Sequence, residues 1–165
     1  MISFPVFIGF IIFLRLLELV VAKRNETWAR KRGAVEYGKS HYPFIVLLHT
    51  LFIISMIAEF MYNGGTFHRW IFLAIIFLAS LKVWTIASLG KYWNTKILRV
   101  PGSVFIKKGP YKLFRHPNYF IVICEILLLP MVFNLYFTAI LFSVLNAVML
   151  TVRIREEEKV WAVAS

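Results

Sequence analysis

Residues 117–152 read PNYFIVICEILLLPMVFNLYFTAILFSVLNAVMLTV, an apolar stretch of the kind that crosses a lipid bilayer. About 20 apolar residues span the hydrocarbon core as a helix, so this stretch has nearly the length of two spans. Pro130 and Asn134 interrupt it, because proline breaks the hydrogen bonding of a helix and asparagine favours turns. We therefore predict two helices packed as a tight hairpin.

Three further apolar stretches precede this hairpin, at residues 4–22, 44–62 and 69–89. The composition agrees with them, since 60% of the 165 residues are apolar, against about half in soluble domains. We predict an all-α integral membrane protein, with residues 1–165 forming one domain of about five transmembrane helices. Any chemistry must then use helix ends and loops.

The positive charges indicate how the chain is oriented. Nineteen Lys and Arg face eight acidic residues; residues 23–39 hold six of the basic ones and residues 90–116 hold seven. Basic loops stay in the cytoplasm beside anionic lipid, which predicts an external N-terminus and a cytoplasmic C-terminus. No basic stripe stands clear of the apolar segments, so we expect lipid rather than nucleic acid as a partner.

Several chemical classes lack their sequence signatures. The single cysteine, Cys124, excludes an intramolecular disulfide. Neither a phosphate-binding glycine-rich loop nor a nucleophile elbow is present. The four histidines have no metal-ligand spacing, so we expect no metal site.

The 27-residue segment 90–116 is the longest loop, and loops of this length are usually functional or disordered. Residues 96–106 read as a short hairpin around Pro101-Gly102. His116-Pro117 is a good helix entry, and a helix N-terminus suits a carboxylate or phosphate. The alternative is a basic interfacial loop in which Tyr111 and Tyr119 lie at the membrane surface.

The C-terminal tail continues the last helix. At 100° per residue, Asn146, Arg153 and Glu157 share one face. Three successive acids at residues 156–158 oppose the helix dipole, which favours a ligand-binding role. The alternative is a solvated helix end with an Arg153–Glu157 pair.

Ionisable residues also lie inside the spans. Arg15 and Glu18 are one turn apart and can pair, and His49 and Lys82 are at similar depth. Glu125 is eight residues past Pro117, or about 12 Å deep. Such residues mark a site or pair with one another, so Glu125 is either functional or a partner of Lys82 or Arg15.

Two motifs about 40 residues apart resemble the isoprenylcysteine carboxyl methyltransferase family; they are Gly109-Pro-Tyr111 with Arg115-His-Pro-Asn-Tyr119, and Arg153-Ile-x-x-Glu157-Glu158, with Leu89-Gly90 and Trp93 upstream. The specific part covers residues 89–160. The resemblance implies S-adenosylmethionine as cofactor, in a pocket at the cytoplasmic face. It implies cofactor-binding roles for Lys108, Gly109, Tyr111, His116, Pro117, Tyr119 and Glu157, and catalytic roles nearer the acceptor for Arg115, Arg153 and Glu158.

The rest of the chain resembles small bacterial members of this family found beside type III polyketide synthases, through Arg15-Leu-Leu-Glu18, Ala22-Lys-Arg-Asn-Glu26, Glu36-Tyr-Gly-Lys39 and His41-Tyr-Pro43. Those members O-methylate alkylpyrones, which implies an enol or phenol acceptor and a functional link to such a synthase. The polar residues inside the bundle would then line a binding site for the polar head of the acceptor; they are Arg15, Glu18, His49 and Glu125.

Three other functions fit the sequence as alternatives. The first is methyl esterification of an isoprenylcysteine-type carboxylate. The second is a sterol-reductase-like enzyme using NADPH, whose 2′-phosphate Lys107 and Lys108 could bind. The third is a non-catalytic membrane subunit.

Overall fold

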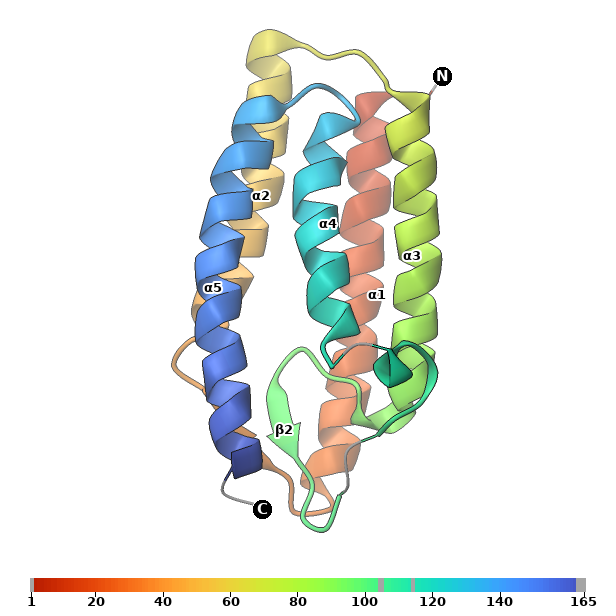
Figure 1. Cartoon of the computed structure of the whole chain (residues 1–165). Coiled ribbons are helices and arrows are strands. Elements are labelled where there is room, and N and C mark those ends of the chain that lie inside the picture. The colour runs from red at the N-terminus through yellow and green to blue at the C-terminus, as the bar shows by residue number, and fades with distance from the viewer. Residues whose placement is uncertain (1, 104–105, 114, 163–165) are drawn as a thin grey trace.

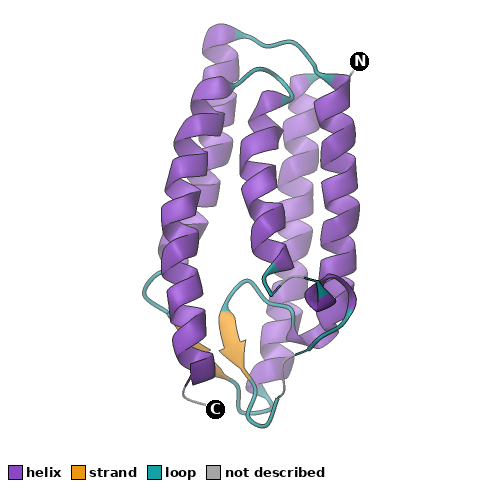
Figure 2. Cartoon of the chain, viewed as in Figure 1, coloured by secondary structure: helices purple, strands orange, loops and turns teal. Residues whose placement is uncertain are grey.

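The computed structural model describes residues 2–103, 106–113 and 115–162, and five long helices dominate this part of the chain (Figures 1 and 2). The all-α architecture is therefore confirmed. The helices are α1 (Phe4–Arg30), α2 (Tyr42–Asn63), α3 (Arg69–Leu89), α4 (Pro117–Met131) and α5 (Tyr136–Ala162), with short 3-10 turns at Gly90–Tyr92 and Gly109–Lys112.

Four helices are long and apolar enough to cross a membrane, at Phe4–Arg30, Tyr42–Asn63, Arg69–Tyr92 and Tyr136–Lys159. α4 is apolar but has only 15 residues. At 1.5 Å per residue it is about 22 Å long, against a hydrocarbon core of about 30 Å. The protein is an integral membrane protein in which the fourth helix is short.

The short α4 creates the space for a site. α5 packs on α2 and α4, and α4 packs on α3. At the end of the bundle where the C-terminus lies, α4 does not extend as far as α1, α3 and α5 (Figure 1). The segment after α3 folds into the space beyond the first turn of α4. The N-terminus lies at the other end of the bundle.

The tight hairpin of the last two helices is confirmed, although its turn falls later than Pro130. Pro130 is inside α4, and the chain turns at residues 132–135, where Asn134 adopts a left-handed φ of 61°. Glu59 of α2 caps the start of α5, because its carboxylate accepts hydrogen bonds from the backbone N–H groups of Phe137 (3.0 Å) and Thr138 (2.8 Å). The unpaired N–H groups of a helix start favour such an anion.

α1 differs from the predicted span 4–22, because the helix continues to Arg30. Lys23 and Arg24 are the charged residues with which the apolar stretch ends, but residues 22–30 contain neither proline nor glycine to stop the helix. Gly33, with a φ of 76°, lies in the turn that follows. The extra two turns carry Asn25 and Glu26 to the level of the 90–99 segment.

The structure describes part of the hairpin predicted over residues 96–106 and adds a pairing that the sequence did not predict. Strand β2 (Ile97–Arg99) pairs antiparallel with β1 (Val35–Tyr37), which comes from the first loop. The Pro101-Gly102 turn is present, with Gly102 at a φ of 71° and Ser103 N–H bonded to the Val100 carbonyl at 3.1 Å. Residues 104–105 of the expected second strand lie outside the described residues.

The hydrophobic core fills the half of the bundle that holds the N-terminus. Phe4 stacks on Phe60 with ring centroids 3.8 Å apart, and Phe133 meets Phe4 edge-on at 5.2 Å. Buried residues of α2, α4 and α5 such as Met56, Ile126 and Phe142 complete this cluster. The half that holds the C-terminus is less well filled, and both cavities described below extend into it.

Candidate active site

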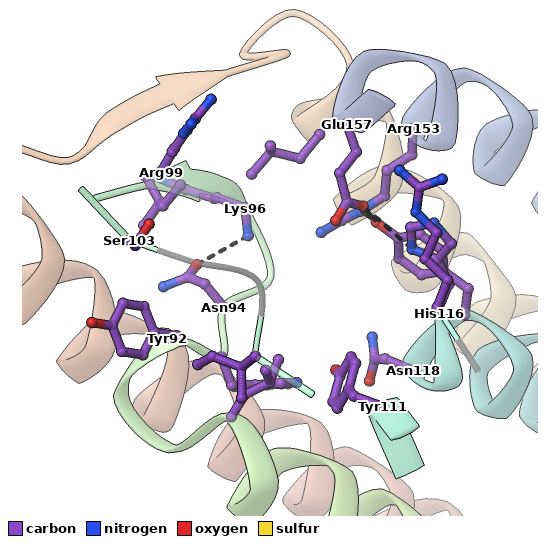
Figure 3. A pocket seen from close by; sticks show the side chains of 17 residues that line it. Tyr92, Asn94, Lys96, Arg99, Ser103, Tyr111, His116, Asn118, Arg153 and Glu157 are labelled. Atoms are coloured by element: carbon purple, nitrogen blue, oxygen red, sulfur yellow. Dashed lines mark hydrogen bonds and ion pairs between the residues drawn. The ribbon is translucent and has the colours of Figure 1, made fainter. Parts of the chain in front are cut away.

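A cavity of about 160 Å³ lies between the start of α4, the end of α5 and the segment after α3 (Figure 3). Its lining is rich in polar side chains and forms two walls. The segment after α3 forms one wall, which we call the loop wall. The start of α4 and the end of α5 form the other, which we call the helix wall. The lining residues are Leu89, Tyr92, Trp93, Asn94, Lys96, Ile97, Leu98, Arg99, Ser103, Ile106, Tyr111, Arg115, His116, Asn118, Tyr119, Arg153 and Glu157.

The helix wall is organised around Tyr119, whose hydroxyl donates to the Glu157 carboxylate at 2.5 Å. The same hydroxyl accepts a bond from Arg153 Nε at 2.9 Å. The His116 ring stacks on Tyr119, and its Nδ1 lies 3.8 Å from Glu157. The two sequence motifs therefore meet in space. The sequence suggested a direct Arg153–Glu157 pair, and in the structure the Tyr119 hydroxyl bonds both residues.

The loop wall is held by α1. Asn25 is buried, and its side-chain amide donates to the carbonyls of Gly90 (3.1 Å) and Trp93 (2.7 Å). Asn94 donates back to the Ala22 carbonyl at 2.9 Å. Lys96 bonds Glu26 at 2.9 Å, which raises the pKa of the lysine and keeps it charged. Since α1 fixes this wall at several points, the cavity has a defined shape.

Three buried polar atoms of the lining have no hydrogen-bond partner among the described residues: Trp93 Nε1, His116 Nε2 and Asn118 Oδ1. Buried polar groups are nearly always paired, so these atoms indicate a polar ligand. Burial raises the pKa of Tyr111 above the ordinary tyrosine value, so its phenol stays protonated and can donate. The mix of donors, acceptors and aromatic rings fits S-adenosylmethionine, which carries a base, a ribose and an amino acid.

Some predicted cofactor residues lie outside the lining. Lys108 is exposed, as is Lys107, so neither places positive charge in the cavity for a 2′-phosphate. Pro117 is buried at the start of α4. Gly109 packs on α3: a Cβ there would lie 2.1 Å from Ser88 Oγ, and its φ is 54°. Gly109 and Pro117 therefore set the course of the backbone beside the cavity, and their roles toward the cofactor stay predictions.

The three residues predicted as catalytic differ in position. Arg153 lines the cavity, and Arg115 lines it with a side chain that is 57% exposed. Glu158 is 53% exposed, lies 4.0 Å from Arg115 and is outside the lining. Of the three, Arg153 is the residue that the fold brings to the centre of the site.

A second cavity of about 310 Å³ lies deeper, between α1, α2 and α5, with mostly apolar walls. Leu16, Leu19 and Val46 line it, and about half of each residue is exposed. The two cavities share five lining residues, which we call the shared wall: Trp93, Asn94, Asn118, Tyr119 and Arg153. A polar cavity and an apolar one therefore meet at a common boundary.

Four ionisable residues of the spans form one network of ion pairs, which we call the ion network. Arg15 bonds Glu18 at 3.0 Å and Glu125 at 2.8 Å, and Lys82 bonds the same two acids at 2.7 and 2.9 Å. Glu125 pairs with both of the partners that the sequence offered it. Two cations and two anions balance one another, which favours the structural alternative for Glu125 and for Arg15.

This network also contributes to the second cavity, because Arg15, Glu18 and Lys82 line it together with His49. His49 Nδ1 lies 2.9 Å from the Ile45 carbonyl one turn earlier in α2. Glu125 is outside the lining. Of the four residues predicted to meet the acceptor, three therefore reach the cavity. Among the described residues, no group of three or more His, Cys, Asp or Glu side chains forms a metal-binding cluster.

The residues that sequence reasoning missed are those of the loop wall: Tyr92, Asn94, Lys96 and Asn118 at its edge. Asn118 stands inside the Arg-His-Pro-Asn-Tyr motif, so its position could have signalled it. Tyr92, Asn94 and Lys96 carry no such signal, because contacts with α1 position them: Tyr92 with the Trp28 ring, Asn94 with the Ala22 carbonyl and Lys96 with Glu26.

Comparisons with known proteins agree with this geometry. Residues 70–163 match the isoprenylcysteine carboxyl methyltransferase (ICMT) family. The uncharacterized protein YpbQ of Bacillus subtilis is 48% identical over 159 residues, covering 94% of this chain and 95% of that protein. An uncharacterized protein of Haemophilus influenzae is 30% identical over 152 residues, covering 90% and 88%. No solved structure matches the chain significantly.

Proposed function

The chain belongs to the isoprenylcysteine carboxyl methyltransferase family of membrane methyltransferases, and from this premise we propose that it transfers a methyl group from S-adenosylmethionine to an oxygen atom of a lipophilic acceptor. The observation that carries the proposal is the shared wall, where a polar cavity and an apolar cavity meet. A methyltransferase for lipids needs such a pair of sites.

The polar cavity is the proposed cofactor site. Trp93, His116 and Asn118 offer it unpaired buried atoms, and Glu157 offers a carboxylate held by Tyr119. The N-terminus of α4 carries the partial positive charge of the helix dipole, which suits a carboxylate. When bound, S-adenosylmethionine supplies an electrophilic methyl group on a sulfonium.

The chain's own task is then to align the two ligands and to exclude water. Arg153 lines both cavities and bonds Tyr119, so its positive charge is fixed at the boundary. A positive charge favours the ionised form of a nearby acceptor oxygen. An enol or phenol that has given its proton to water needs no strong base, which suits a site without a catalytic triad.

The apolar cavity is the proposed acceptor site. Leu16, Leu19 and Val46 line this cavity and are exposed. In this proposal the acceptor's hydrocarbon tail passes beside these apolar side chains and stays in lipid. We propose an alkylpyrone-type polyketide as acceptor, made by a type III polyketide synthase, because the chain outside residues 89–160 resembles the small bacterial members that act on such lipids.

Cofactor binding tests the function directly. We expect purified protein to bind S-adenosylmethionine with micromolar affinity and not NADPH, and to transfer a labelled methyl group to lipophilic enols or phenols. His116→Ala should weaken binding about tenfold, since it removes one hydrogen bond from a buried site. Isothermal calorimetry in detergent measures both. Tight NADPH binding, or no affinity for S-adenosylmethionine, would contradict the proposal.

The orientation is a separate prediction. We propose that the site faces the cytoplasm of a bacterial cell membrane, because residues 23–39 and 90–116 carry 13 of the 19 basic residues, as six and seven. Reporter fusions should place Lys31 in the cytoplasm and Gly64 outside it. Fusions that put both positions on one side would overturn this topology.

A further inference from the structure

The second cavity contains a polar group that neither the ion network nor the cofactor site explains. Asn146 of α5 is only 4% exposed and lines this cavity but not the first. No hydrogen bond joins its side-chain amide to another residue that the structure describes, and the amide is not enclosed by protein, because Asn146 lines the cavity. A polar amide in a mostly apolar cavity wall is unfavourable unless a ligand pairs with it, so Asn146 points to a ligand.

The other polar groups of this cavity divide into two sets. Arg15, Glu18 and Lys82 are paired with one another or with Glu125. At the shared wall, by contrast, Trp93 Nε1 and Asn118 Oδ1 are buried and have no partner among the described residues. The unused hydrogen-bonding capacity thus lies on the Asn146 side and at the shared wall, rather than in the ion network.

The position of Asn146 suits the acceptor's head. It lies seven residues before Arg153 on α5, which is about two turns or 10 Å along the axis, and on the same face. A head group between these residues lies against the shared wall. The tail can then follow the apolar lining toward Ile53 and Ile12.

We propose that Asn146 is a specificity-determining residue that binds the oxygen-bearing head of the acceptor. The inference rests on the proposed function and assigns this residue to the acceptor side of the boundary. The amide both donates and accepts hydrogen bonds, so it can pair with a hydroxyl, carbonyl or ionised oxygen of the head.

The test compares Asn146→Leu with Ser143→Ala. Ser143 is one turn away on α5, and its buried hydroxyl also has no partner among the described residues, but it is outside both cavity linings. Kinetics with a long-chain alkylphenol and a 4-hydroxy-6-alkyl-2-pyrone, and with a fatty acid of equal chain length, measure KM and kcat. Calorimetry measures the affinity of each variant for S-adenosylmethionine. An unchanged affinity shows that the variant is folded and that its cofactor site is intact.

We expect wild-type protein to prefer the hydroxyl-bearing lipids. Asn146→Leu should raise KM for them about tenfold or more, because a site built to hydrogen-bond a hydroxyl loses affinity when its partner is removed. Its affinity for S-adenosylmethionine should stay within about twofold of wild type. Ser143→Ala should change neither quantity. Asn146→Ala provides a second variant if the leucine does not fold.

Three outcomes separate the possible failures. Unchanged KM in a folded Asn146 variant would overturn the inference while the methyltransferase function stands. Wild-type preference for the fatty acid would overturn the enol or phenol acceptor of the proposed function, whereas the KM of the Asn146 variants tests the residue. A wild-type protein that does not bind S-adenosylmethionine would overturn the proposed function itself, and the inference with it.

Discussion

Replacing Glu125 with alanine is expected to lower the free energy of unfolding by about 3–5 kcal/mol. Glu125 accepts bonds from Arg15 at 2.8 Å and from Lys82 at 2.9 and 3.1 Å in the interior of the bundle. Without it, two buried cations share the single carboxylate of Glu18. An uncompensated buried charge is expensive, because no water is available to solvate it.

The double variant Glu125→Leu with Lys82→Met is the matched control. It removes one cation and one anion together and leaves the Arg15–Glu18 pair intact. Replacing a buried pair by apolar side chains is often nearly neutral, so most of the stability should return. Thermal and denaturant unfolding in detergent measure the difference. A single variant no less stable than the double would show that the network does not hold the bundle together.

The members of this network could be found in the sequence, but its connections could not. Arg15 and Glu18 are three residues apart, and helical geometry alone predicts that they pair. Glu125 was expected to choose between Lys82 and Arg15, and the structure gives it both. Which side chains meet depends on how α1, α3 and α4 pack, and hydropathy carries no information about packing.

The same limit explains the errors in the fold. Apolar runs gave the helices correctly, because the membrane requires every backbone group to be paired within the span. They did not give the end of α1, since a helix can continue beyond the bilayer as far as its residues allow. The pairing of Ile97–Arg99 with Val35–Tyr37 joins segments about 60 residues apart, and only the folded chain brings them together.

The candidate site was predicted where a motif encodes it locally. His116 and Tyr119 share the first turn of α4, and Arg153 and Glu157 share one face of α5, so both sets project as units. Gly109 and Pro117 of the same motif lie outside the cavity lining, where they set the course of the backbone. A motif therefore identifies the region of a site more surely than the role of each residue within it.

Glu157 and Glu158 provide the sharpest test of this distinction, because adjacent positions on a helix point about 100° apart. Glu157 lies in the polar cavity, bonded to Tyr119 and near His116. Glu158 is exposed and outside the lining. We expect Glu157→Ala to weaken S-adenosylmethionine binding about 10- to 150-fold, the loss of about 1.5–3 kcal/mol that accompanies removal of a charged hydrogen-bond partner.

Glu158→Ala removes the same charge from the same helix end, so its affinity for S-adenosylmethionine should stay within about twofold of wild type. Any general effect of charge near the cofactor site would be seen in both variants alike. A loss of affinity in the Glu157 variant alone would mean that Glu157 either contacts the cofactor directly or orients Tyr119. Tyr119→Phe distinguishes direct contact from orientation, because it keeps the Glu157 carboxylate and removes the hydroxyl that is bonded to it. Equal losses in the two glutamate variants would mean that the cofactor does not occupy this cavity.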